Sequence, residues 1–168
     1  MGTELNLAKA KPKLAIRTLA SPISGESKTL TSHPDLLIAK GFLGKGVCIS
    51  PISSRLVAPC KAKVIAIAPT GHQLTLGAGN GLIIELIIGK NAKESHGVGF
   101  STKVKVGEVV AQGQVLVELD LIRLKASLPA TAVAMLISKG ALKMTPYHGS
   151  RRAGEDDIMQ LIVKENRG

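Results

Sequence analysis

Turn-forming residues recur along most of this chain roughly every eight to twelve residues, so only short elements fit between them. The turn marks are Gly, Pro, Asn or Ser clusters such as Ser24-Gly25, Gly44-Lys45-Gly46, Pro69-Thr70-Gly71, Gly97-Val98-Gly99 and residues 77–81. The segments between them are rich in β-branched residues, as in Val47-Cys48-Ile49, Val64 to Ile67, Leu82 to Ile88 and Val115 to Leu119. This pattern predicts an all-β protein, an antiparallel β-sandwich or barrel.

Helical signals are sparse. Residues Asp35 to Phe42 can form one or two turns, and Leu121 to Leu128 can form another, with Asp120 as its N-cap. The 168 residues are 45% hydrophobic, which is enough for one compact domain with an aliphatic core. We expect that domain to cover residues 20–168.

Residues 1–19 form a basic arm whose charges are Lys9, Lys11, Lys13 and Arg17, and Pro12 interrupts any helix there. We expect this arm to be disordered. The whole chain has 22 Lys and Arg against 12 Asp and Glu, a net charge of +10, which favours an acidic partner or surface. Its 2 Phe, 1 Tyr and 0 Trp argue against a protein that stacks on single-stranded bases, although binding to phosphate backbones stays open.

No apolar run approaches the length of about 20 residues that spans a bilayer, and the N-terminal sequence lacks the apolar centre of a secretory signal. Cys48 and Cys60 form no CxxC motif and no Cys/His metal spacing. We therefore expect two reduced thiols in a cytoplasmic protein.

The four histidines are the first candidates for chemistry. His33 precedes a proline, His96 lies in a Gly-rich loop and His148 lies in a turn, so we expect all three rings to face water. His72 begins an alternating segment that places its ring on the same face as Leu74 and Leu76. Both a hydrogen-bonded structural role and a functional role stay open for His72. The chain contains no GxSxG and no GxxxxGK[ST], and its glycines at 77–81 lie between two predicted strands, as in a hairpin loop.

A series of short motifs carries a family resemblance: Ser21-Pro22-Ile23-Ser24-Gly25, His33-Pro34-Asp35, Val57-Ala58-Pro59, Thr70-Gly71-His72, Gly81 to Gly89, Gly97-Val98-Gly99-Phe100 and Val109 to Leu121. In this order and spacing, from about Ala20 to Lys164, the chain resembles the glucose-type enzyme IIA domain of the bacterial phosphoenolpyruvate-dependent sugar phosphotransferase system. The resemblance implies the duplicated hybrid motif, an antiparallel β-sandwich.

In this family one histidine accepts a phosphoryl group from the carrier HPr and passes it to the sugar permease. A second histidine and a threonine two residues before it stabilise the phosphate, and the resemblance places these at His72 and Thr70. The acceptor position falls on Ile87, within Gly81 to Gly89. Because isoleucine has no lone pair, it cannot accept a phosphoryl group. We expect phosphoryl relay to be lost at this position.

The resemblance also locates a docking face. Family carboxylates that meet HPr arginines correspond to Lys40, Lys45, Lys61 and Asn91, whereas Asp35 keeps its acid. These changes predict poor docking of HPr. The apolar residues of the face are Leu37, Ile38, Phe42 and Leu43, which fit either a partner surface or the core under a short helix.

Glu85 replaces an apolar aromatic residue of the family, two residues from Ile87 and so on the same strand face. Family members can bind zinc across a partner through the two active-site histidines. Here His72 and Glu85 alone are too few ligands for zinc, so we expect no metal and no cofactor.

The leading hypothesis is an enzyme IIA homologue that has lost phosphoryl acceptance and acts as a regulatory or protein-binding module. A second reading is an active phosphocarrier in sugar uptake that uses His72. A third is a basic module that binds acidic polymers.

Overall fold

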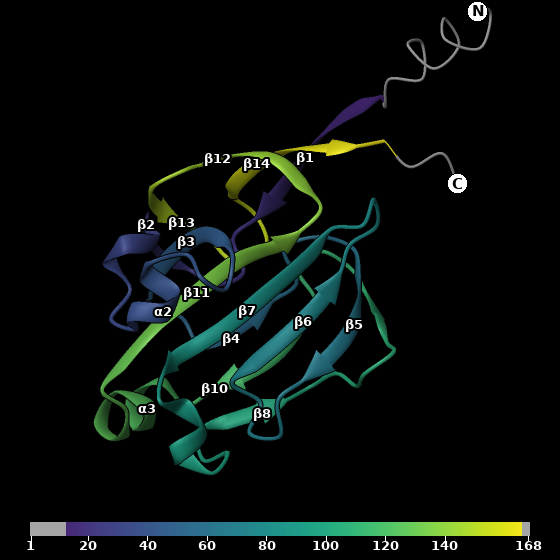
Figure 1. Cartoon of the computed structure of the whole chain (residues 1–168). Coiled ribbons are helices and arrows are strands. Elements are labelled where there is room, and N and C mark those ends of the chain that lie inside the picture. Colours follow the sequence, from purple (N-terminus) through teal and green to yellow (C-terminus); the bar gives the residue numbers. More distant parts are fainter. Residues whose placement is uncertain (1–12, 166–168) are drawn as a thin grey trace, which may run out of the picture.

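The structure, a computed structural model, describes residues 13–165 and consists mainly of antiparallel strands (Figure 1). An eight-stranded sheet has the order β13-β2-β3-β11-β7-β6-β5-β9. In that order its strands are Gly149–Arg151, Gly25–Thr29, Lys45–Pro51, Ala130–Lys139, Ile83–Lys90, Gln73–Gly77, Ala62–Ile67 and Val109–Val110. The predicted all-β fold class is confirmed.

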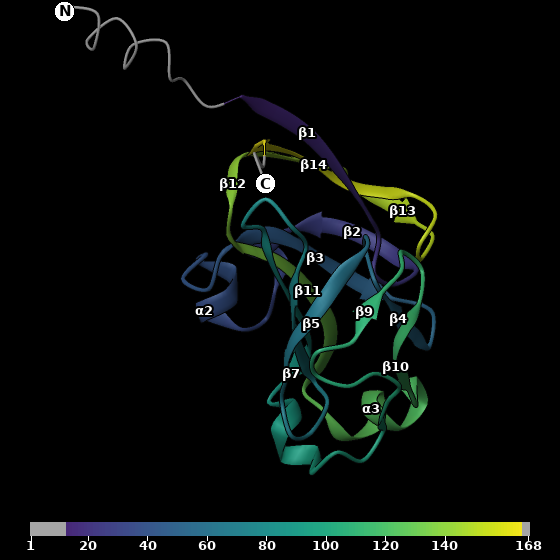
Figure 2. The same ribbon diagram turned by 90° about the vertical axis from the view of Figure 1, so that its right-hand side faces the viewer.

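Two smaller sheets complete the molecule. The first has the order β1-β14-β12, with strands Leu14–Ala20, Asp157–Lys164 and Ala141–Pro146. The second has the order β4-β10-β8, with strands Arg55–Val57, Val115–Leu119 and Phe100–Thr102. Figures 1 and 2 show the β1-β14-β12 sheet at one end of the molecule and helix α3 (Leu121–Ser127) at the other.

Both predicted helical segments are present, and an aspartate begins each. The Asp35 carboxylate accepts a hydrogen bond of 2.9 Å from the Leu37 amide at the start of α2 (Leu36–Ala39). Asp120 accepts one of 3.1 Å from the Arg123 amide at the start of α3. The 3₁₀ turns are η1 (Leu30–Ser32) and η2 (Ala92–Ser95). No helix within residues 13–165 is long and apolar enough to cross a bilayer.

The two faces of strand β7 contact different apolar clusters. Ile84, Leu86 and Ile88 belong to the main aliphatic core between the sheets. Ile87 points to the opposite face, where it forms a small cluster with Ile38, Ala134 and Leu136. Because Ile38 comes from α2, this second cluster holds the helix against the large sheet.

The structure corrects the predicted boundary of the N-terminal arm. Strand β1 pairs with β14 from Leu14 to Ala20, so residues 14–19 are not disordered. The alternation of Ala15, inside, with Ile16, outside, is the strand signal that the nearby lysines and Pro12 obscured. The remainder of the arm, residues 1–12, lies outside the described residues.

Candidate functional site

A groove of about 250 Å³ lies between the α2 region and the ends of β6 and β7. Its walls come from three parts of the chain: the α2 region, the start of β6 and the turn after β7. The lining residues are Asp35, Ile38, Leu43, His72, Gln73, Ile87, Gly89, Asn91, Ala92 and Lys93. The groove thus brings together His72 and Ile87, which the sequence places 15 positions apart.

His72 is half-buried and hydrogen-bonded to Thr70, whose Oγ1 meets the ring Nδ1. The His72 carbonyl accepts a bond of 2.8 Å from the Ile88 amide, which fixes this residue beside β7. Burial lowers the pKa of His72, and the nearby Lys93 cation lowers it further. The ring is therefore mainly neutral at pH 7, with Nδ1 engaged by a hydroxyl group.

Ile87 is only 7% exposed. It pairs with Gln73 of β6, the residue that follows His72 in the sequence. Its neighbours Ile38, Ala134 and Leu136 are apolar. The position that the resemblance assigns to the acceptor is thus an aliphatic surface, part of the packing that anchors α2.

Glu85 lies on the same face of β7 as Ile87, as its spacing predicted. Its Oε2 accepts hydrogen bonds from Thr75 Oγ1 at 2.7 Å and from Gln73 Nε2 at 3.5 Å. The side chain is half-buried. These contacts hold the carboxylate on β6 and β7, beside the apolar cluster of Ile87.

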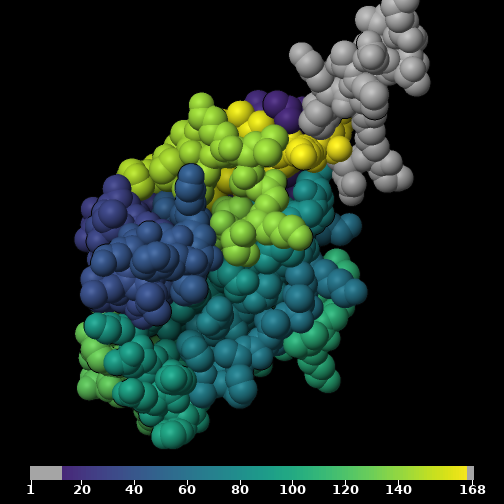
Figure 3. Space-filling view, in the orientation of Figure 1, coloured from purple at the N-terminus to yellow at the C-terminus, as the bar shows by residue number. Residues whose placement is uncertain are grey.

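The apolar residues of the predicted docking face separate into two groups. Ile38 is 3% exposed and belongs to the core cluster under α2. In contrast, Leu37, Phe42 and Leu43 are 59%, 71% and 45% exposed, and Leu36, which the sequence reasoning did not include, is 68% exposed. Figure 3 shows the α2 segment as a raised blue surface beside the teal strands. We call the exposed residues Leu36, Leu37, Phe42 and Leu43 the α2 patch.

The four positions that replace family carboxylates do not share one surface. Asn91 lines the groove, and Lys40 caps the C-terminal end of α2. Lys45 begins β3 and lines a small hollow with Leu142 and Lys143. Strands β5 and β6 form an antiparallel hairpin. Lys61 lies just before β5, beside Val109 and Val110, whereas His72 lies just before β6, at the opposite end of this hairpin. Of the four, only Asn91 lines the groove, and strand β5 carries Lys61 farther from it than the sequence grouping assumed.

His33 is a second correction, since the ring expected in water is 4% exposed. Its Nδ1 accepts a hydrogen bond of 3.0 Å from the Asp35 amide, next to the cap of α2. Burial is the largest influence on the His33 ring and lowers its pKa. The hydrogen bond from the Asp35 amide satisfies one nitrogen of the buried ring. The rings of His96 and His148 are exposed, as predicted.

Lys93 is the functional candidate that the sequence reasoning missed. It lies in η2, after a turn in which Gly89 and Asn91 have φ angles of +74° and +55°. These left-handed residues reverse the chain at the end of β7 and bring η2 back to the groove. A Gly-x-Asn sequence directly after a predicted strand was the available signal.

Cys48 and Cys60 are both buried free thiols, and burial raises the pKa of each. Within residues 13–165, no group of three or more His, Cys, Asp or Glu side chains is placed to hold a metal ion. The expectation of a site without metal stays a prediction.

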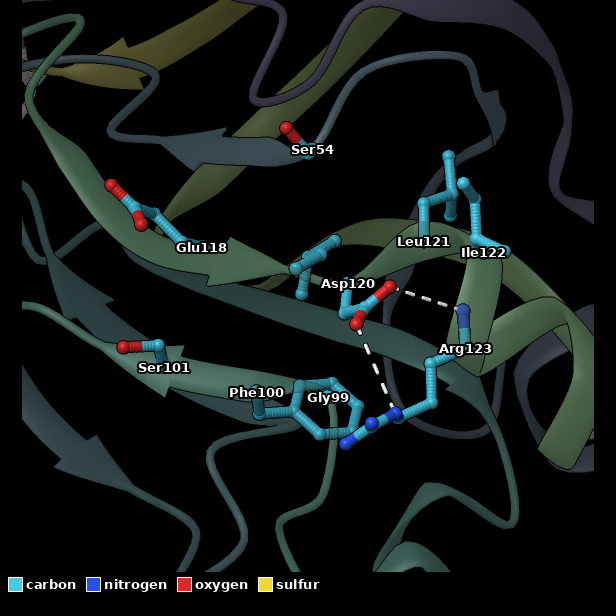
Figure 4. A pocket seen from close by; sticks show the side chains of 10 residues that line it. Ser54, Gly99, Phe100, Ser101, Glu118, Asp120, Leu121, Ile122 and Arg123 are labelled. Atoms are coloured by element: carbon cyan, nitrogen blue, oxygen red, sulfur yellow. Dashed lines mark hydrogen bonds and ion pairs between the residues drawn. The ribbon is translucent and has the colours of Figure 1, made fainter.

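A larger hollow of about 590 Å³ lies beside α3 (Figure 4), and His72 is not among the residues that line it. Its charged residues include Asp120, which points to Arg123 in Figure 4 and caps α3. Another, Glu118, lies 3.9 Å from Lys103 Nζ. Since Asp120 and Glu118 are engaged within the chain, this hollow is a weaker candidate than the His72 groove.

Comparisons with known proteins identify the family of this chain. Residues 17–141 match the family model described as phosphoenolpyruvate-dependent sugar phosphotransferase system, EIIA 1. The glucose-specific EIIA component of Oceanobacillus iheyensis is 28% identical over 152 residues, which are 86% of this chain and 90% of that protein. The glucose-specific EIIA component of Borreliella burgdorferi is 36% identical over 113 residues, 67% of this chain and 60% of that protein.

Some relatives are much longer. The mannose-specific EIIBCA component of Corynebacterium glutamicum is 35% identical over 114 residues, which are 66% of this chain and only 17% of that protein. Among solved structures, glucose permease IIA from Mycoplasma capricolum aligns with a TM-score of 0.83 and 24% identity, over 87% of this chain and 96% of that one. This likeness shows the fold. Because the family model matches residues 17–141, most of this chain, the chain belongs to the EIIA 1 family of the phosphoenolpyruvate-dependent sugar phosphotransferase system.

Proposed function

We propose that this EIIA homologue does not accept a phosphoryl group and acts in the cytoplasm as a regulatory module that binds a protein partner. The observation that carries the proposal is Ile87, an aliphatic side chain in the groove beside the hydrogen-bonded pair of His72 and Thr70. By the family resemblance Ile87 occupies the acceptor position. Its side chain offers no atom that can form a bond to phosphorus.

The α2 patch is the partner surface of this proposal. Three of its side chains, Leu36, Leu37 and Phe42, are more than half exposed although they are large and apolar. Lys40 and Lys45 lie next to these residues in the sequence and form no ion pair among the described residues. An apolar centre with a basic rim fits a partner with an acidic rim.

A second candidate is an active carrier in which His72 takes the phosphoryl group. Burial and Lys93 keep this ring neutral, the form that can attack phosphorus, and the Lys93 cation favours an approaching phosphate. Against it, Nδ1 of the ring is already bonded to Thr70, and the resemblance gives this histidine the stabilising role.

Incubation with phosphoenolpyruvate, enzyme I and HPr separates the two candidates. Intact mass spectrometry at alkaline pH, where phosphohistidine survives, should show the unmodified mass. A gain of one phosphate that disappears in His72→Ala would refute the proposal and establish the carrier.

A second experiment tests the docking face. Ile87→His alone should remain a poor acceptor from phosphorylated HPr, because Lys40, Lys45 and Asn91 still lack the family's acids. Adding Lys40→Glu, Lys45→Glu and Asn91→Asp should raise the transfer rate strongly. Adding Lys61→Glu instead is the control for a single charge reversal, to be compared with Lys40→Glu alone, since it places an acid at the distant start of β5 and should change little. A fast Ile87→His single variant would contradict the electrostatic argument.

A further inference from the structure

The outer face of the β1-β14-β12 sheet combines apolar and basic side chains in rows. The strand register places Leu14 beside Lys164. Ile162 of the central strand lies between Ile16 and Lys143, and Gln160 lies between Thr18 and Thr145. Leu14 and Ile16 are 58% and 68% exposed, and their neighbours Ala15 and Leu19 face the core. We call these rows the outer sheet face.

Its margins are basic as well. Lys13 precedes β1, and Leu142 is the extra residue of a bulge in β12, where it is 56% exposed. Lys45 continues the margin, since it lines the same small hollow as Leu142 and Lys143. Lys13, Lys143 and Lys164 form no ion pair among residues 13–165. The acids of this region are Asp157, at the start of β14, and Glu165, whose amide donates a bond of 2.8 Å to the Lys13 carbonyl, so that Glu165 lies beside Lys13 at one margin.

We propose that the outer sheet face binds the surface of an anionic lipid membrane. Lysines around exposed aliphatic side chains match an interface in which lipid headgroups are negative and the acyl region begins just below them. A second copy of the chain fits poorly, because it would bring lysines against lysines on proteins of net charge +10. A hydrophilic acidic polymer would match the lysines but leave Leu14, Ile16 and Ile162 in water.

The position of this face leaves the His72 groove free. Arg17 of β1 donates to the Ala78 carbonyl, and Asn80 donates to the Lys164 carbonyl at 2.9 Å, so the sheet attaches to the β6–β7 turn. His72 and Ile87 lie at the other end of that hairpin. Five residues of strand separate the ends by about 17 Å. The groove is therefore clear of the outer sheet face, whereas the α2 patch shares Lys45 with its margin. The vesicle experiments change neither Lys45 nor the α2 patch, so failure of membrane binding and failure of the proposed function are distinguishable.

Sedimentation with lipid vesicles tests the proposal on the full chain. The protein should bind vesicles that contain phosphatidylglycerol and phosphatidylcholine, and it should not bind pure phosphatidylcholine vesicles. Lys143→Glu/Lys164→Glu should weaken binding by about a hundredfold, because each reversal replaces an attraction by a repulsion. The matched control, Lys63→Glu/Lys105→Glu, makes the same change of net charge at exposed residues elsewhere and should weaken it far less.

The apolar contribution is measured separately. Ile16→Ser should weaken binding at physiological salt, whereas Ile122→Ser, at an 85% exposed residue of α3, should not. Because the chain has no tryptophan, Ile16→Trp provides a single reporter whose emission should shift to the blue on anionic vesicles. Ile122→Trp should not shift. Circular dichroism of each variant confirms that the fold is retained.

Three results would overturn the proposal. Absence of binding to anionic vesicles would refute it directly. Undiminished binding by the Ile16 and Lys143/Lys164 variants would place the contact elsewhere in the chain, including residues 1–12. Equally tight binding to heparin that Ile16→Ser leaves unchanged would identify an acidic polymer as the ligand instead.

Discussion

The ring of His33 lies in the protein interior, so its protonation is linked to folding. Burial lowers its pKa from the ordinary value of 6.5, Asp35 opposes this effect, and Lys90 adds to it. The folded pKa is therefore below the unfolded one, and the unfolded chain takes up a proton first as the pH falls. The contribution of His33 to stability is complete above about pH 6.5 and is lost as the pH falls toward the folded pKa.

Urea unfolding at a series of pH values tests this linkage. In His33→Asn the amide oxygen can still accept the Asp35 N–H, but the side chain no longer titrates. Wild type should lose stability relative to this variant between about pH 7 and 5. His72, whose pKa is lowered in the same direction, adds a second contribution that His72→Asn removes. Parallel curves for wild type and His33→Asn would contradict the assignment.

Ile87 has a structural role besides its place in the groove. It is 7% exposed among Ile38, Ala134 and Leu136, so Ile87→Ala should lower the free energy of unfolding by about 3 kcal/mol. Ile122→Ala removes the same atoms from an 85% exposed position and should change it by less than about 0.5 kcal/mol. Equal losses measured by urea unfolding would show that Ile87 is not packed as described.

At the scale of elements, the short helix α2 depends on its N-terminal cap. Four residues are too few for a helix to be stable alone, so α2 relies on Asp35 and on the packing of Ile38. Asp35→Ala should therefore cost about 1 kcal/mol, whereas Asp35→Asn keeps an oxygen acceptor and should cost less.

The α2 patch provides an independent measurement of the same cap. If the proposed partner docks there, Asp35→Ala should weaken its binding more than Asp35→Asn does, because the helix that presents Leu36 and Leu37 frays. Equal unfolding free energies for the two variants would show that the bond from Leu37 N to Asp35 Oδ1 contributes nothing.

Elements with a local signal were predictable, and those defined by distant contacts were not. The caps Asp35 and Asp120 and the hairpin loop at 77–81 follow from neighbouring residues. Strand β1 exists because β14, more than a hundred residues later, supplies its hydrogen-bond partner. In the same way, the pairing of β5 with β6 separates Lys61 from the groove, a result of topology that composition does not contain.

At the scale of the whole molecule, the positive charge is largely uncompensated. Five ion pairs within 4.0 Å occur among residues 13–165, and several exposed lysines, including Lys63, Lys105 and Lys139, belong to none of them. Folding brings these charges together, so their repulsion opposes the compact state. The Debye length shortens to about 8 Å at physiological ionic strength, which screens much of this repulsion.

Adding sodium chloride at pH 7 should therefore raise the Tm of the wild type, with most of the gain below about 0.15 M. The variant Lys63→Glu/Lys105→Glu/Lys139→Glu reduces the net charge without touching the core, so its Tm should start higher and rise less. Differential scanning calorimetry in a dilute buffer measures both effects. An equal rise in Tm for the two proteins would contradict this explanation. It would show that salt acts through anion binding or through the solvent and does not act by screening repulsion among these lysines.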